Sequence, residues 1–199
     1  GAHTFVGLAS TWDLDLGGDI IRKGAFKRTL KNWKDAKRSV PLVDSHDIYT
    51  TVTKVVGKMD HGEETDAGLL AEFSMIPDDQ MADAVFKRVA GGFVDGLSIG
   101  YRAVKVEYPK TEEERKRGVY RYLDEVKLNE VSVVMYPMNP GARIDLSSAK
   151  HLVDMAGRRD LTDDEVKELA ALQAAIAGVL SGAEKVEGDA GAELPSPAD

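Results

Sequence analysis

Residues 91–101 read Gly-Gly-Phe-Val-Asp-Gly-Leu-Ser-Ile-Gly-Tyr, with Ser98 between two glycines and apolar residues alternating around it. This alternation predicts a strand, in which neighbouring side chains point to opposite faces. Leu97, Ile99 and Tyr101 are expected on the core face, and Ser98 on the face that meets solvent or a cleft. The glycines at 96 and 100 leave no side chain beside the hydroxyl, so another backbone is expected to approach closely there.

The chain on either side of this stretch supports a strand. A helix with an apolar stripe is predicted from Pro77 up to the glycine pair that precedes the serine strand. Residues 109–118 predict a charged loop or short helix, and residues 120–126 and 128–135 predict two further strands. Glu130 lies inside the second of these runs among β-branched residues, where a carboxylate must pair, accept hydrogen bonds or reach solvent.

The first third of the chain predicts more strands and one helix. Strands are expected at 4–10, with Gly7 as a possible bulge, and at 51–58 and 68–75, with a hydrophilic turn at 60–66. Residues 24–38 predict an amphipathic helix whose basic side either contacts an acidic partner or is simply solvated. Leu42 and Val43 indicate a buried strand end, so His46 is expected where the chain leaves the core.

The character of the sequence changes after residue 145. Residues 146–160 predict a linker, 161–182 an amphipathic helix that begins with a capping box, and 183–199 a disordered acidic tail. The helix must bury its apolar face on the domain or on a partner. Residues 1–145 are therefore expected to form the main domain.

Composition excludes several classes of protein. The chain has 199 residues, 43% of them hydrophobic and 30% charged, as expected of a soluble globular protein. Its net charge of −8 argues against a nucleic-acid or anionic-membrane partner. No cysteine is present, so disulfides, thiolate metal sites and cysteine nucleophiles are excluded. No apolar run approaches the ~20 residues of a membrane span, and no signal peptide is visible.

Three residues suited to hydrolytic chemistry lie on or beside predicted strands: His46, Ser98 and Glu130. A serine hydroxyl needs a base to become a nucleophile, and a carboxylate behind that base orients the imidazole. Spacing alone makes this trio a weak signal. Gly96 to Gly100 matches the letters of a nucleophile elbow, but a strand rather than a helix follows it, which excludes the α/β-hydrolase context.

Several short segments together resemble the prohead (head maturation) serine proteases of tailed bacteriophages, which are related to the herpesvirus assemblins. They occur in the order of that family and cover about residues 4–145, namely Gly7-Leu-Ala-Ser10, Gly24-Ala-Phe26 with Thr29-Leu30, Pro41-Leu42 leading to His46-Asp47, Val55-Val-Gly-Lys58, Gly68-Leu69, Asp95-Gly-Leu-Ser-Ile-Gly-Tyr101, and Leu128-Asn-Glu-Val-Ser-Val-Val134 followed by Pro137-Met-Asn-Pro140 and Ala142.

The resemblance implies an α+β, mainly β fold, with an assemblin-like β-barrel core flanked by helices. It implies Ser98 as nucleophile and His46 as base, with no cofactor or metal. For the third member, the herpesvirus relatives use a second histidine, whereas this chain offers Glu130, with His61 as the other candidate. Backbone N–H groups around residues 139–142, or Arg143, are the family's position for the oxyanion hole.

The resemblance further implies an endopeptidase inside the immature capsid in the host cytoplasm. Scaffold protein, the N-terminal region of the major coat protein and the enzyme itself would be substrates, with no nucleic-acid or membrane partner. Homodimerisation is an option, because the herpesvirus branch acts as dimers. Two other functions remain open: a non-enzymatic assembly or scaffold component with a degenerate protease domain, and a metal-dependent hydrolase that uses Asp44, His46, Asp47 and His61.

Overall fold

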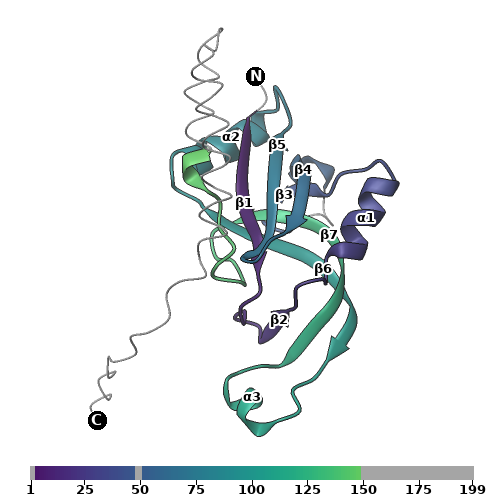
Figure 1. Ribbon diagram of the computed structural model, residues 1–199. Helices are drawn as coiled ribbons and strands as arrows, with labels where there is room; N and C mark the ends of the chain where they lie inside the picture. The colour runs from purple at the N-terminus through teal and green to yellow at the C-terminus, as the bar shows by residue number, and fades with distance from the viewer. Residues whose placement is uncertain (1–2, 48–50, 149–199) are drawn as a thin grey trace, which may run out of the picture.

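The computed structural model describes residues 3–47 and 51–148 (Figure 1). Strands dominate this part of the chain, and three short α-helices and one 3₁₀ turn connect them. In chain order the elements are β1 (Thr4–Thr11), β2 (Asp19–Ile21), α1 (Lys27–Asp35), β3 (Pro41–Asp44), η1 (Val52–Lys54), β4 (Val55–Glu64), β5 (Gly68–Met75), α2 (Gln80–Ala90), β6 (Gly96–Glu107), α3 (Glu112–Lys116) and β7 (Arg121–Val134).

The strands form one mixed, strongly curved sheet. Its order is β1-β5-β4-β3-β7-β2, and β6 pairs with β7 in addition. The long β7 therefore contacts three strands: β6 antiparallel along its length, β2 parallel near its start and β3 parallel near its end. The outer halves of β6 and β7 project as an arm that carries α3 at its tip (Figure 1).

Residues 142–145 close the curved sheet into a barrel. On one side the N–H of Leu97 donates to the Ala142 carbonyl (3.0 Å), and on the other the N–H of Leu8 donates to the Arg143 carbonyl (2.9 Å). Gly7 permits this contact, because a Cβ there would lie 2.7 Å from the Arg143 oxygen. The bulge in β1 lies after Gly7, between Leu8 and Ser10, so the expectation of a bulge at Gly7 itself was wrong.

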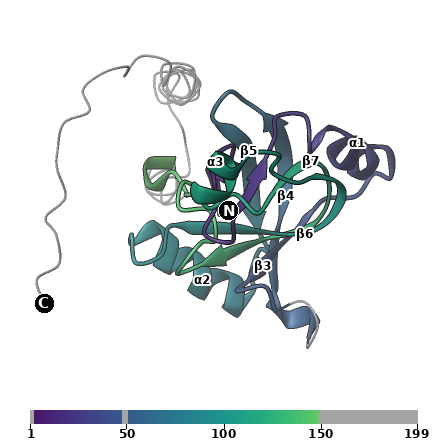
Figure 2. The same ribbon diagram turned by 90° about the horizontal axis from the view of Figure 1, so that it is seen from below.

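The two longer helices lie against the sheet at different places (Figure 2). Side chains of α1 complete the hydrogen bonding of β7, since Thr29 Oγ1 accepts from the N–H of Leu128 (3.1 Å) and Trp33 Nε1 donates to its carbonyl (3.1 Å). Helix α2 buries its apolar residues against β4 and β5, and Asp79 caps its N-terminus. The mainly β barrel with flanking helices confirms the expected fold class.

Three predicted boundaries were wrong. Residues 60–64 continue β4 instead of turning, because they pair with β5 and turn their polar side chains to solvent. The runs at 120–126 and 128–135 form one continuous strand, β7. Helix α2 begins at Gln80, three residues after Pro77, because the chain turns at residues 77–79 and Asp79 provides the cap.

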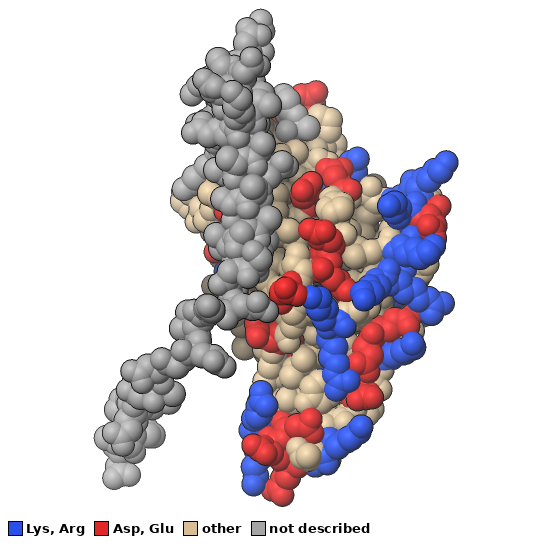
Figure 3. Space-filling model, in the orientation of Figure 1, with Lys and Arg blue, Asp and Glu red and all other residues tan. Residues whose placement is uncertain are grey.

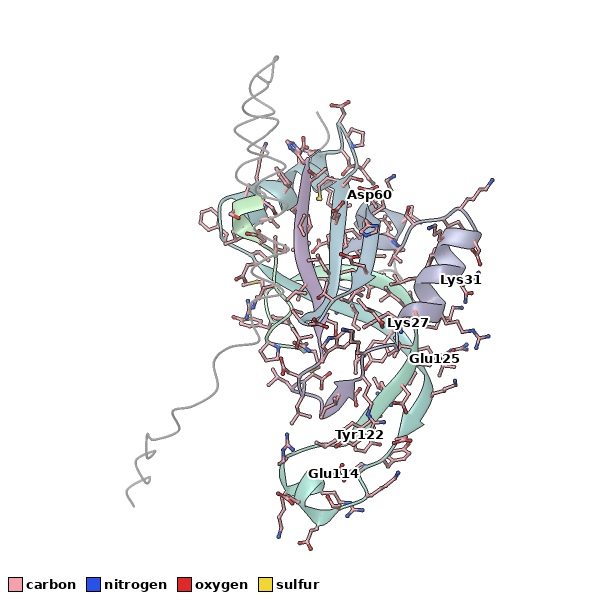
Figure 4. All side chains as sticks on the ribbon, in the orientation of Figure 1. Lys27, Lys31, Asp60, Glu114, Tyr122 and Glu125 are labelled. Carbon is pink, nitrogen blue, oxygen red and sulfur yellow. The ribbon has the colours of Figure 1, made fainter. Side chains whose placement is uncertain are left out.

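The basic side of α1 lies at the surface. Lys and Arg gather over this helix in Figure 3, and Lys27 and Lys31 are labelled on it in Figure 4. Part of the charge is paired within the chain: Arg28 contacts Glu125 at 3.1 Å, and Lys31 contacts Asp35 one turn away. Exposed pairs of this kind contribute little to stability.

The predicted C-terminal helix and tail, and most of the predicted linker, lie outside the described residues. Within the described part, Leu146 still packs against the core, and the Ser148 hydroxyl accepts a hydrogen bond from the N–H of Val6 (3.1 Å). In the same part of the chain, no helix is long and apolar enough to cross a membrane.

Candidate active site

The end of β3 and the serine strand β6 lie on either side of β7. In the register, Ser132 of β7 is the partner of Val43 on β3 and of Ser98 on β6. Directly paired residues of neighbouring strands point to the same face with Cβ atoms about 5 Å apart. The histidine that follows β3 is thereby brought to the serine strand, although the two are distant in sequence.

His46 is held in an unusual backbone conformation. Ser45 and His46 have positive φ angles of 57° and 62°, the left-handed region that side chains other than glycine rarely adopt. Hydrogen bonds to β7 fix this turn: the N–H of Ser45 donates to the Val133 carbonyl (3.2 Å), and the N–H of His46 donates to the Ser132 hydroxyl (2.9 Å). Such strain costs about 1–3 kcal/mol per residue and is often found at functional sites.

The imidazole of His46 contacts the carboxylate of Glu130. Nδ1 of His46 and Oε1 of Glu130 are 2.6 Å apart, and the Glu130 side chain is only 2% exposed. The other carboxylate oxygen, Oε2, accepts a hydrogen bond from the Ser132 hydroxyl at 2.7 Å. Both oxygens are thus paired, as a buried carboxylate requires. Because Nδ1 faces Glu130, Nε2 is the ring nitrogen left for other partners.

Gly100 makes room for this carboxylate. Gly100 is the β6 partner of Glu130, and a Cβ at this position would lie 2.0 Å from Glu130 Oε1. The sequence predicted the close approach of another backbone here, and for Gly100 this was wrong: the neighbour is a side chain. The second glycine of the serine stretch therefore serves the residue opposite it.

Ser98 and His46 both line a cleft of about 500 Å³. Ser98 is 8% exposed, and the His46 side chain is 41% exposed. The other lining residues come from β1, the turn after it, β2, the outer part of β6 and the loop after β7, namely Ala9, Ser10, Asp13, Asp15, Gly17, Asp19, Ile21, Ile99, Tyr101, Tyr120, Arg121, Val134, Tyr136, Met138 and Asn139.

A buried charged cluster also lines this cleft. Arg121 donates to both oxygens of Asp19 (2.7 and 2.8 Å), and the Tyr101 hydroxyl donates to Asp19 Oδ2 (2.7 Å). Burial, and then the hydrogen bond to Asp19, raise the pKa of Tyr101. Alternation predicted Tyr101 on the core face with Leu97, but a bulge between Gly100 and Tyr101 shifts the register and turns this ring to the cleft. A bulge of this kind has no clear signature in the sequence.

His61 lies away from the cleft. It sits on β4, its side chain is 59% exposed, and it lines a separate hollow with Leu30 and Trp33 of α1. Surface exposure was expected for His61, and His46 contacts Glu130 instead of it. Within residues 3–47 and 51–148, no group of three or more His, Asp or Glu side chains is placed to hold a metal ion, so the metal-hydrolase set is not assembled there.

The loop after β7 uses two of its N–H groups internally. The N–H of Gly141 donates to Asn139 Oδ1 (3.1 Å), and the N–H of Ala142 donates to the Asn139 carbonyl (3.0 Å). Asn139 Oδ1 also accepts from the Thr11 hydroxyl on β1 (3.0 Å), which fixes the loop against the barrel. Gly141 and Ala142 are therefore poor candidates for the oxyanion hole.

Comparisons with known proteins agree with this arrangement. The family model described as caudovirus prohead serine protease matches residues 2–156. The prohead protease of Enterobacteria phage HK97 is 30% identical over 141 residues, which cover 70% of this chain and 58% of that relative, so the chain spans less than two thirds of its length.

Solved structures show the same fold. The bacteriophage T4 capsid assembly protease superposes with a TM-score of 0.53 at 13% identity, over 67% of this chain and 82% of that one. A herpesvirus protease, that of KSHV, has a TM-score of 0.41 at 10% identity, over 81% and 80% of the two chains. From the match over residues 2–156 and the HK97 relative, the chain belongs to the caudovirus prohead serine protease family.

Proposed function

We propose that this chain is a serine endopeptidase of phage capsid maturation, with Ser98 as nucleophile, His46 as general base and Glu130 as the residue that orients the base. One observation carries the proposal: His46 Nδ1 lies 2.6 Å from the buried Glu130 carboxylate, at a cleft that Ser98 also lines. Membership of the prohead serine protease family supports the same chemistry.

The chemistry follows from the positions of these groups. Ser98 Oγ attacks the scissile carbonyl carbon, and its proton passes to Nε2 of His46, the ring nitrogen turned away from Glu130. The resulting imidazolium keeps its Nδ1–H toward Glu130 Oε1, and the negative charge of the carboxylate stabilises it. His46 then donates the proton to the leaving amine as the C–N bond breaks. Water hydrolyses the acyl-serine ester by the same steps.

The substrates proposed are proteins of the immature capsid. The enzyme would act inside the prohead, in the host cytoplasm, on the scaffold and on the N-terminal region of the major coat protein, and it would cleave itself. The relationship to the prohead protease of phage HK97 supports this role. No cofactor takes part in the proposed steps.

A fluorophosphonate probe tests the nucleophile without knowledge of the cleavage sequence. Ser98 Oγ forms a bond to phosphorus, the P–F bond breaks, fluoride leaves, and the serine proton passes to His46. Intact mass and peptide mapping are expected to show one adduct, on Ser98, and none in Ser98→Ala. Ser148→Ala, which removes a buried hydroxyl outside the cleft, is expected to label like the wild type.

Proteolysis is then tested on scaffold and coat protein co-expressed with each variant. Wild type and chelator-treated wild type are expected to cleave them, whereas Ser98→Ala falls to background, because loss of the nucleophile costs about 10⁶ in rate in subtilisin. Cleavage by Ser98→Ala at the wild-type rate would contradict the proposal. Absence of both labelling and cleavage in the wild type would favour the non-enzymatic scaffold component instead.

The sequence beyond residue 148 is proposed to tether the enzyme to the scaffold or to carry self-cleavage sites. Because Leu146 and Ser148 belong to the packed domain, a truncation is best made after residue 148. Probe labelling of residues 1–148 is expected to match the full chain, while the amount of enzyme packaged into proheads falls. Unchanged packaging would count against a tether.

A further inference from the structure

Ser132 occupies the centre of the site. Its side chain is fully buried, at 0% exposure, on the strand between the end of β3 and the serine strand β6. Its partner across β6 and β7 is Ser98 itself. The sequence marked this residue only as one of the alternating positions of a strand.

The polarity of its two hydrogen bonds follows from the partners. The N–H of His46 can only donate, so the Ser132 oxygen accepts that bond at 2.9 Å. A carboxylate can only accept, so the single hydroxyl hydrogen points to Glu130 Oε2, at 2.7 Å. The hydroxyl therefore has one orientation, and that orientation serves both the base and its carboxylate.

We propose that Ser132 is a positioning residue for the catalysis, acting through His46 and Glu130; this inference rests on the proposed function. One oxygen atom sets where the strained His46 backbone lies and how the Glu130 carboxylate is turned. The distance from Nδ1 to Oε1 is fixed as a result, because both of its ends are attached to the same group. Without the hydroxyl, a buried carboxylate oxygen and a backbone N–H lose their partners together.

An ordinary buried serine would have a different effect from a positioning residue. Ser148 is the matched control: it is 6% exposed, accepts from the N–H of Val6 (3.1 Å) and donates to the Asp145 carbonyl (2.6 Å). Ser132→Ala and Ser148→Ala thus each remove one oxygen atom that makes one donated and one accepted hydrogen bond. A loss of stability is expected of both variants, and a change in the chemistry only of Ser132→Ala.

The experiment measures the rate of fluorophosphonate labelling of Ser98 in the full chain, below the unfolding temperature of each variant. For Ser132→Ala, we expect the maximal labelling rate to fall about 10- to 100-fold, the range seen when outer partners of site ligands are removed. The half-saturating probe concentration is expected to stay unchanged, because the cleft itself is intact. The low-field ¹H NMR resonance of the His46 Nδ1–H is expected to move upfield or broaden.

A second pair of variants separates the hydroxyl from packing. Ser132→Thr and Ser132→Val have the same shape, and only threonine keeps the oxygen. Threonine is expected to recover most of the rate and the low-field resonance that valine loses. Equal rates for the two, or a Ser132→Ala rate equal to that of Ser148→Ala, would overturn the inference. Labelling of Ser98→Ala, or none in the wild type, would instead overturn the proposed function.

Discussion

Replacing Gly100 by alanine tests the geometry of the site through a residue that has no side chain. The added Cβ would lie 2.0 Å from Glu130 Oε1, whereas ordinary contacts begin near 3.4 Å. The carboxylate must therefore retreat by about 1.4 Å, which breaks its hydrogen bonds of 2.6 Å to His46 and 2.7 Å to Ser132. Overpacking costs about 1–3 kcal/mol, and hydrogen bonds to a charged group contribute about 1.5–3 kcal/mol.

The expected result is a fall of about 100-fold in the rate at which Ser98 reacts with the fluorophosphonate, because a misplacement of about 1 Å has an effect of this size. A loss of about 3 kcal/mol would also lower the midpoint of thermal unfolding by roughly 6–12 °C. Gly62→Ala is the matched control, since its Cβ would meet only the flexible end of Met59 in a strand outside the cleft.

A double mutant excludes a general effect of alanine in β6. Without the carboxylate there is nothing for the new Cβ to displace, so adding Gly100→Ala to Glu130→Ala is expected to lower the labelling rate no further. Additive losses, or a Gly100→Ala protein that reacts at the wild-type rate, would refute the claim that Gly100 exists to accommodate Glu130.

Three other predictions concern charged groups. Arg121→Ala leaves the buried Asp19 without its cation and should lower the free energy of unfolding by about 3 kcal/mol in urea denaturation, where a loss under about 1 kcal/mol would contradict a structural ion pair. Burial raises the pKa of Asp15, so Asp15→Asn, which keeps the Oδ1 acceptor, should unfold at a higher temperature than the wild type at pH 7 but not at pH 3, where both side chains are neutral. The N–H of Thr111, more than any other group, lowers the pKa of Glu114 to about 2. Because this pKa is depressed, the cap of α3 should persist from pH 7 down to the region of pH 2, which a ¹³C titration of the Glu114 carboxyl can follow; a midpoint near the ordinary 4.5 would refute it.

The choice of Glu130 over His61 as the partner of His46 shows what sequence can predict about the site. A carboxylate within a run of β-branched residues needs a partner, and this requirement pointed to Glu130 before the fold was known. The parallel pairing of β3 with β7 could not be predicted, and it is this pairing that brings His46 to the carboxylate. Alternation places side chains on faces, but it does not say which strands are neighbours.

The cleft was harder to predict than the fold. The roles of Gly100 and Ser132 depend on the register between β6 and β7, which sequence alternation leaves open. Tyr101 was assigned to the wrong face because one bulge reverses the alternation after it. The two runs of β7 looked separate for a related reason: the strand has different neighbours at its two ends, so its pattern of burial changes along its length.

The strained turn at Ser45 and His46 has a consequence for the timing of activity during folding. The turn is anchored on residues 132 and 133, and the histidine meets a carboxylate 84 positions away in sequence. Contacts of such long range carry a large loop-closure entropy and form late. A chain still being synthesised, or only partly folded, has its serine and histidine far apart and is harmless to its neighbours. The topology thus delays proteolysis until folding is complete, with no inhibitor required.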